Sequence, residues 1–112
     1  MEFGLSEDQR LLQDSVGRFL EEQSPLEKVR EAADSNNFVP RGLWDGIREL
    51  GVPGLLVPED FGGMGLGFLD AAIISEMIGR HVAPMPYVGT SVMAPVALTL
   101  AGSEAQKQNW LP

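Results

Sequence analysis

Apolar residues recur at helical spacing along the chain, and polar residues fill the positions between them. Over residues 7–23 the apolar positions lie three and four residues apart, at Leu12, Val16, Phe19 and Leu20. This spacing places them on one face of a helix and leaves the charged residues on the rest of its circumference. The pattern therefore predicts an amphipathic first helix.

Two serine–glutamine pairs mark the starts of helices. Ser6 is followed three residues later by Gln9, and Ser103 is followed by Gln106 in the same way. In this capping box each side chain accepts a hydrogen bond from the backbone N–H of the other residue. We therefore expect the first helix to begin after Ser6, and a short last helix to begin after Ser103 and reach Trp110.

A third serine suggests a further helix start. Ser24 precedes Pro25, which is favoured at the first helical position, and Glu27 stands where the box would close. The pattern predicts that Ser24 caps a short second helix running to about Ala33. A third helix is expected to start at Pro40 and to end at a C-terminal cap, Gly51.

Glycines and prolines interrupt the pattern in the middle of the chain. Residues 52–54 read V-P-G and predict a turn. Residues 55–57 are apolar, and we expect an extended, buried connector or a short strand there. Residues 58–67 contain four glycines, which predict a loop.

The clearest helical pattern covers residues 68–81. Its apolar positions are Leu69, Ile73, Ile74, Met77 and Ile78. Pro84 ends this helix, and a fifth helix is expected from about Tyr87 to Leu100. No stretch alternates as a half-buried strand does. The chain is therefore predicted to be one all-α domain over residues 1–112, a five- to six-helix up-down orthogonal bundle.

The stretch from Val82 to Ser103 contains no charged residue and is long enough to span a bilayer. Pro84, Pro86 and Pro95 interrupt it, and a continuous lipid-facing helix does not tolerate such breaks well. We therefore expect a buried core segment and no membrane span.

The net charge and the lack of cysteine limit the kinds of partner and of site that the chain can have. Acidic residues outnumber basic ones by 16 to 8, which gives a formal net charge of −8 and makes nucleic acid and anionic membranes poor partners. The chain has no cysteine, so disulfides, thiolate nucleophiles and cysteine metal sites are excluded. The N-terminus is polar and acidic, unlike a signal peptide, and we expect a cytoplasmic protein.

Two features suggest a binding or catalytic site, but neither is complete. Gly65 and Gly67 begin a dinucleotide-binding pattern, yet Asp70 stands where its third glycine belongs. We interpret this segment as a tight turn. His81 is the only histidine and is expected to close a helix. No catalytic or metal-binding residue follows from these patterns, and they leave both an interaction module and a piece of an enzyme open.

Longer motifs favour a piece of an enzyme over an interaction module. Residues 50–55 read L-G-V-P-G-L and lead into V-P-E-D-F-G-G-M-G-L-G at 57–67, while residues 101–112 read A-G-S-E-A-Q-K-Q-N-W-L-P. Their order and spacing resemble the N-terminal domain of the acyl-CoA dehydrogenase family over nearly the whole chain. Residues 80–86, R-H-V-A-P-M-P, resemble a branch common among bacterial members.

This resemblance implies the first domain of a three-domain enzyme that carries FAD. In the family, a glutamate removes the α-proton of an acyl-CoA thioester while the β-hydride passes to the flavin. That glutamate and most flavin contacts lie in the other two domains, and neither Glu59 nor Glu76 matches the motif of the base. We therefore expect no catalytic residue here and an inactive isolated chain. The implied partners of the full-length enzyme are acyl-CoA and electron-transfer flavoprotein, in a homo- or hetero-oligomer.

The resemblance also implies that the helix over residues 87–100 forms one wall of the acyl pocket. Four residues whose spacing places them on one face of this helix are the candidates for binding the substrate: Thr90, Ser91, Ala94 and Leu98. The small side chains of Ser91 and Ala94 would leave room for a ligand tail, but close packing against a neighbouring helix would explain them equally well. Two alternatives remain: a truncated helical binding or assembly module, and a subunit that completes a partner's active site.

Overall fold

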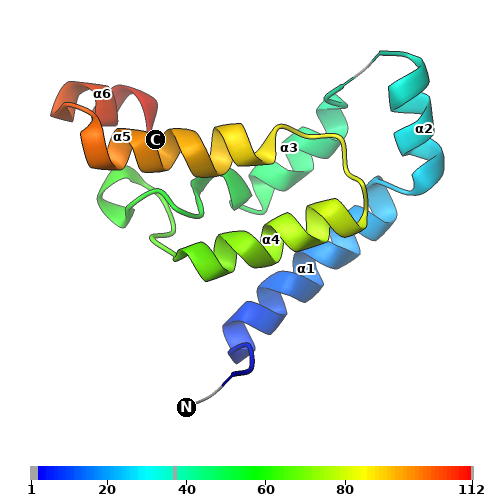
Figure 1. Cartoon of the computed structure of the whole chain (residues 1–112), viewed down its shortest axis with the longest axis horizontal. Helices are drawn as coiled ribbons and strands as arrows, with labels where there is room; N and C mark the ends of the chain where they lie inside the picture. The colour runs from blue at the N-terminus through cyan, green and yellow to red at the C-terminus, as the bar shows by residue number, and fades with distance from the viewer. Residues whose placement is uncertain (1–2, 37, 112) are drawn as a thin grey trace.

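The computed structural model describes residues 3–36 and 38–111 and forms six α-helices over these ranges (Figure 1). They are α1 (Glu7–Gln23), α2 (Leu26–Asp34), α3 (Arg41–Glu49), α4 (Phe68–Arg80), α5 (Ala94–Ala101) and α6 (Glu104–Trp110). Two short 3-10 helices, η1 (Val52–Gly54) and η2 (Glu59–Phe61), and a π-helical segment, η3 (Val88–Met93), join them. The described residues contain no strand, so the all-α prediction is confirmed.

The core lies where α1 packs along α4 and where α3 and η1 close one side (Figure 1). Its fully buried members come from these four elements and the turn after η1: Val16, Leu20, Ile47, Val52, Leu55 and Ile74. The molecule extends 42 × 39 × 18 Å, and its shortest dimension is less than two helix diameters of about 10–12 Å. Such a flat arrangement leaves the outer helices with one covered face each.

Both serine–glutamine capping boxes form as predicted. Ser6 Oγ accepts from the Gln9 N–H at 3.1 Å, and the Ser6 N–H donates to Gln9 Oε1 at 3.0 Å. Ser103 and Gln106 make the same pair of bonds, at 3.3 and 2.9 Å. These boxes satisfy backbone donors at the first turns of α1 and α6, which have no partner within their helices.

The predicted cap at Ser24 is wrong. α2 begins at Leu26 and has Pro25 as its N-cap, without a side-chain hydrogen bond. Ser24 instead ends α1, where its N–H donates to the Leu20 carbonyl at 2.8 Å. Its side chain turns into the interior and is only 3% exposed, so it cannot reach the first turn of α2.

The extended connector or strand expected at residues 55–57 is also wrong, although Leu55 and Val57 are buried as expected. Leu55 has helical dihedral angles (φ −59°, ψ −44°) because the turn of η1 continues into it. The returning loop then bonds to this segment: the Leu66 N–H donates to the Leu55 carbonyl and the Gly65 N–H to the Val57 carbonyl, both at 2.9 Å.

Asp70 fixes the start of α4 and joins it to α1. The Gly67 N–H donates to Asp70 Oδ2 at 2.9 Å, and Gln9 Nε2 donates to Oδ1 of the same carboxylate at 3.2 Å. Gly62 and Gly65 have positive φ angles of 82° and 60°. The Asp70 carboxylate therefore caps the first turn of α4, where a dinucleotide-binding loop would hold a phosphate. This agrees with the interpretation of the glycine segment as a structural turn.

The uncharged stretch after α4 is less buried than we expected. Within it, four residues are buried, namely Ala83, Tyr87, Ser91 and Pro95. The opposite side is exposed, as at Met93 (64%) and Leu100 (81%), because no described element covers that side in so thin a molecule. None of the helices described combines the length and apolar character needed to cross a bilayer.

Candidate functional site

The segment with the four candidate residues begins as a π-helix and continues as α5. Pro95 has no N–H to donate to the Ser91 carbonyl, and its ring would clash with that carbonyl in a regular α-helix. The turn before it is wider: the Ala94 N–H donates to the Gly89 carbonyl five residues back. Pro95 is the signal in the sequence that could have suggested this change of helix type.

The wider turn separates the four candidates. Thr90, Ala94 and Leu98 line one cavity of about 250 Å³, whereas Ser91 does not line it. Ser91 is 1% exposed and faces the interior, where its hydroxyl lies 3.4 Å from that of Thr90. The structure therefore brings three of the four predicted residues together.

The rest of the cavity comes from the glycine loop and the end of α6. The residues opposite the helix are Pro53, Gly54, Val57, Gly62 and Gly63, with Pro95, Trp110 and Leu111 closing the ends. A Cβ on Gly63 would collide with the Val57 backbone, so only glycine permits this close approach. Among the residues that the structure describes, no charged side chain lines the cavity. The resemblance alone did not assign the loop glycines or Trp110 to this site.

A second apolar cavity of about 250 Å³ lies on another side of α5. Its lining residues are Leu56, Leu66, Gly67, Phe68, Val96, Thr99 and Leu100. Phe68 and Leu100 remain largely exposed. Thus α5 borders two uncharged hollows, and its side chains are available to a ligand or to a further protein surface.

Tyr87 fixes this segment to the core. Its hydroxyl donates to the Ala71 carbonyl of α4 at 3.0 Å and is buried. Burial raises the pKa of Tyr87 to about 12, because the charged phenolate loses its hydration there. The side chain therefore stays protonated at neutral pH and acts as a hydrogen-bonding anchor between α4 and η3.

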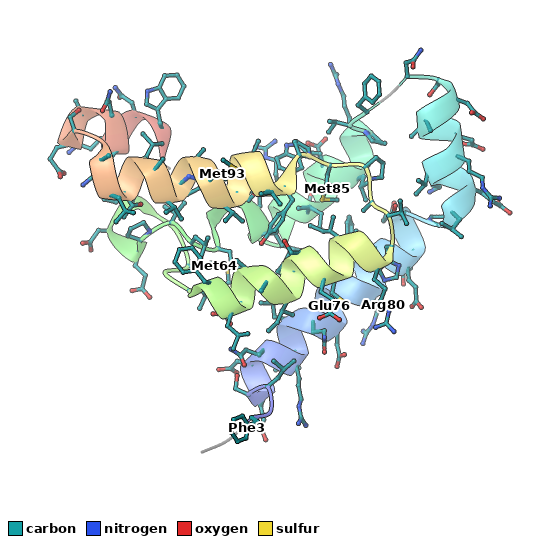
Figure 2. The ribbon with its side chains drawn as sticks, viewed as in Figure 1. Phe3, Met64, Glu76, Arg80, Met85 and Met93 are labelled. Carbon is teal, nitrogen blue, oxygen red and sulfur yellow. The ribbon has the colours of Figure 1, made fainter. Side chains whose placement is uncertain are left out.

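Neither the acidic residues nor His81 is among the described residues that line the cavity. Glu76 and Arg80 extend from the edge of α4 away from η3, where Met93 is labelled (Figure 2). His81 ends α4 as predicted, at the C-cap position. Within residues 3–36 and 38–111, no three histidine or carboxylate side chains gather in a way that could hold a metal ion. The described residues that line the cavity can contact apolar matter, but they include no carboxylate, histidine or lysine that could act as an acid or base.

Comparison with known proteins shows which family and which relatives the chain is similar to. Residues 6–112 match the family model described as acyl-CoA dehydrogenase, N-terminal domain. The chain is 38% identical to mitochondrial isovaleryl-CoA dehydrogenase of Pongo abelii over 112 positions, covering 97% of this chain and 26% of the relative. It is 32% identical to (2S)-methylsuccinyl-CoA dehydrogenase of Cereibacter sphaeroides, covering 97% of this chain and 20% of the relative.

A third relative is named for a reductase and not for a dehydrogenase. The chain is 31% identical to acryloyl-CoA reductase (NADH) of Anaerotignum propionicum, covering 100% of this chain and 28% of the relative. All three relatives are named for reactions of CoA thioesters, and this chain spans between a fifth and a third of their length.

Proposed function

Since the chain belongs to the acyl-CoA dehydrogenase family, in which it matches the N-terminal domain, we propose that it supplies one wall of the acyl-binding cleft of a flavin-dependent acyl-CoA dehydrogenase. The observation that carries the proposal is the uncharged cavity in which Thr90, Ala94 and Leu98 face the glycine loop. An acyl tail offers only apolar surface, and an uncharged hollow of this kind receives it without desolvating a charge.

The described residues that line this cavity do not fit FAD by themselves. The cavity of about 250 Å³ lies below the usual range of roughly 300–1,000 Å³ for small-molecule sites, and no cationic side chain lines it to meet a pyrophosphate. FAD is therefore proposed for the whole enzyme, with the cofactor held mainly by other domains. Acyl-CoA, electron-transfer flavoprotein and other subunits are its proposed partners.

The role of the wall can be tested with two matched alanines in the whole enzyme that carries this domain. Ala94 lines the cavity, and Ala97, also exposed on α5, does not. Ala94→Leu fills tail space and is expected to lower kcat/KM for the longest acyl-CoAs by roughly tenfold to a hundredfold, while the shortest are spared. Ala97→Leu is expected to leave the chain-length profile unchanged.

The same pair of variants can refute the proposal. If Ala94 packed against another helix, the larger side chain would overpack that contact and destabilise the fold. A uniform loss of kcat/KM at every acyl length, together with a lower melting temperature, would contradict the pocket assignment. An equal effect of Ala97→Leu would contradict it as well.

The 112-residue chain by itself is expected neither to retain FAD nor to oxidise acyl-CoA, because the described residues that line the cavity include no general base and no cationic side chain to meet a pyrophosphate. The measurement is the visible spectrum of the purified chain, with a dye-reduction assay beside it. Stoichiometric bound flavin, or acyl-CoA-dependent dye reduction, would disprove this expectation.

A further inference from the structure

The helix α2 lies at the end of the molecule opposite α6, and it projects there from the other helices (Figure 1). A cavity of about 330 Å³ separates it from the start of α3. Val29 and Ala32 line this cavity from α2, and Gly42 and Leu43 line it from α3. The face of α2 that turns toward the molecule is therefore not packed tightly against α3.

The helices α2 and α3 are both nine residues long, but they are anchored differently. Within α2, all of which the structure describes, only Ala32 is buried, and it does not belong to the core cluster. In α3, by contrast, Leu43 and Ile47 belong to that cluster and Trp44 packs against it. No described element packs extensively against α2. The core therefore holds α3 firmly and α2 weakly.

The local sequence of α2 does not compensate for this weak packing. Isolated helices shorter than about 12–15 residues are marginal in water. The N-cap residue Pro25 makes no side-chain hydrogen bond, and Asp34 stands in a last turn without a basic residue, where its charge opposes the helix dipole. The ion pairs of the described chain lie in α3 and α6. Only the C-terminal end is closed, by the Ser35 hydroxyl, which donates to the Glu31 carbonyl at 2.7 Å.

Ser24, in the link between α1 and α2, gives an independent indication. Its side chain is 3% exposed, and its hydroxyl has no hydrogen-bond partner among the residues that the structure describes. A buried hydroxyl without a partner is costly to the folded state. Because Ser24 lines the same cavity as Val29 and Ala32, opening of α2 would admit water to it and remove this cost. The closed position of α2 is therefore disfavoured at its own junction with α1.

We propose that α2 is a conformational switch, which opens by local unfolding while α1, α3 and α4 keep the core intact. In the closed state α2 forms one wall of the cavity beside α3. In the open state that wall is absent and the Ser24 hydroxyl is hydrated. A molecule that binds the closed helix shifts this equilibrium toward the closed state without any change in the core.

The test is hydrogen exchange of the backbone amides of the 112-residue chain. Local opening and global unfolding have separate free energies, so they give amides different protection. Ala32 and Ala33 in α2 are expected to exchange on the order of 100-fold faster than Ile74 and Met77 in α4, relative to their unprotected rates. Low concentrations of urea should accelerate exchange in α4 and leave α2 unchanged, because local opening exposes little surface.

Two serine variants at opposite ends of α2 are expected to act in opposite directions. Ser24→Ala removes the unpartnered hydroxyl and should raise the protection of the α2 amides at least about fivefold. Ser35→Ala is the matched control, because it removes a hydroxyl that has a partner in α2. It should lower the protection of the same amides about twofold or more.

Two charge variants separate α2 from the chain as a whole. Asp34→Lys places a favourable charge at the last residue of α2 and should raise the protection of its amides about twofold to fivefold. Glu49→Lys makes the same change of charge at the last residue of α3. It should leave exchange in α2 unchanged, since the effect of the helix dipole acts only within the last turn.

Three results would overturn the proposal. Equal protection of the α2 and α4 amides, with parallel acceleration by urea, would show that α2 unfolds only together with the core. Unchanged exchange of the α2 amides in both Ser24→Ala and Asp34→Lys would show that their protection does not depend on the closing of α2. An equal effect of Asp34→Lys and Glu49→Lys on these amides would assign the response to the net charge of the chain.

Discussion

The helices α4 and α5 are both rich in apolar residues, but only α4 is buried. Five of its residues are buried: Ala71, Ile73, Ile74, Met77 and Ile78. In α5 only Pro95 is buried, and the preceding η3 buries only Ser91. α4 lies between α1 and the η3–α5 layer, whereas α5 lies at the edge of a molecule 18 Å thick (Figure 1).

This difference shows that apolar composition does not by itself decide burial. An apolar helix is buried only where neighbours cover it, and α5 has few described neighbours besides η3 and α6. An uncharged helix with an exposed apolar face is typical of a surface that another domain, a partner or a ligand covers. The exposed face of α5 is thus consistent with the proposed acyl wall.

The largest effect is expected from a substitution inside α4. Ile74 is fully buried, and Ile74→Ala should lower the free energy of unfolding by about 3–4 kcal/mol, since it removes buried methyl groups and leaves a void. Met93→Ala in η3, where the side chain is 64% exposed, should change it by less than about 0.5 kcal/mol. Urea denaturation measures both. Equal losses would mean that the two layers are equally covered in solution.

A smaller effect is expected at the contact that joins α4 to the η3–α5 segment. Tyr87→Phe removes the hydroxyl that donates to the Ala71 carbonyl and should lower the free energy of unfolding by about 1 kcal/mol. The aromatic ring keeps its packing, so the substitution isolates the hydrogen bond. An unchanged free energy of unfolding would show that this bond does not hold η3 to α4.

The same tyrosine predicts a dependence on alkaline pH. Its pKa is about 12 in the folded chain and 10.0 when unperturbed. Because the folded state binds the phenolic proton more tightly, this contribution to stability is complete below pH 10 and is lost as the pH rises toward 12. Urea denaturation across that range should show a steeper decline for the wild type than for Tyr87→Phe. Parallel declines would assign the pH dependence to other groups.

Helix positions were predictable where a local signal acts alone. The capping box of Ser6 and Gln9 needs only four consecutive residues, so the sequence contains all the information for it. Ser24 carries a similar pattern, but its environment is decided by the packing of α1 against the rest of the fold, which a local pattern does not contain. The cap was therefore predicted at one serine correctly and at the other wrongly.

The candidate site was predictable only in part for a related reason. Thr90, Ala94 and Leu98 lie four residues apart, and the structure places them on one cavity. Ser91 was included because a regular α-helix was assumed. The π-helical turn before Pro95 directs it inward instead. The opposite wall comes from residues 53–63, and only the tertiary fold brings that segment to the helix.

The smallest effect is expected at the turn between the two layers, where Val82 follows α4. The Val82 N–H donates to the Gly79 carbonyl at 3.1 Å, and the Ala83 N–H donates to the Ile78 carbonyl at 3.0 Å. This is the Schellman arrangement, whose left-handed position is usually glycine. Val82 occupies it with φ of 50°, which costs a side-chain-bearing residue roughly 1–2 kcal/mol.

Val82→Gly should therefore relieve strain, while the greater freedom of glycine in the unfolded chain offsets roughly 0.5–1 kcal/mol of the gain. The side chain is 56% exposed and contributes little packing, so a net rise of about 0.5–1 kcal/mol in the free energy of unfolding is expected. The matched control is Gly51→Ala at the end of α3, where φ is 77° and the same logic predicts a loss. If Val82→Gly instead lowered stability while Gly51→Ala behaved as expected, the valine side chain would be holding the two layers together, and the joint would be stronger than its exposure indicates.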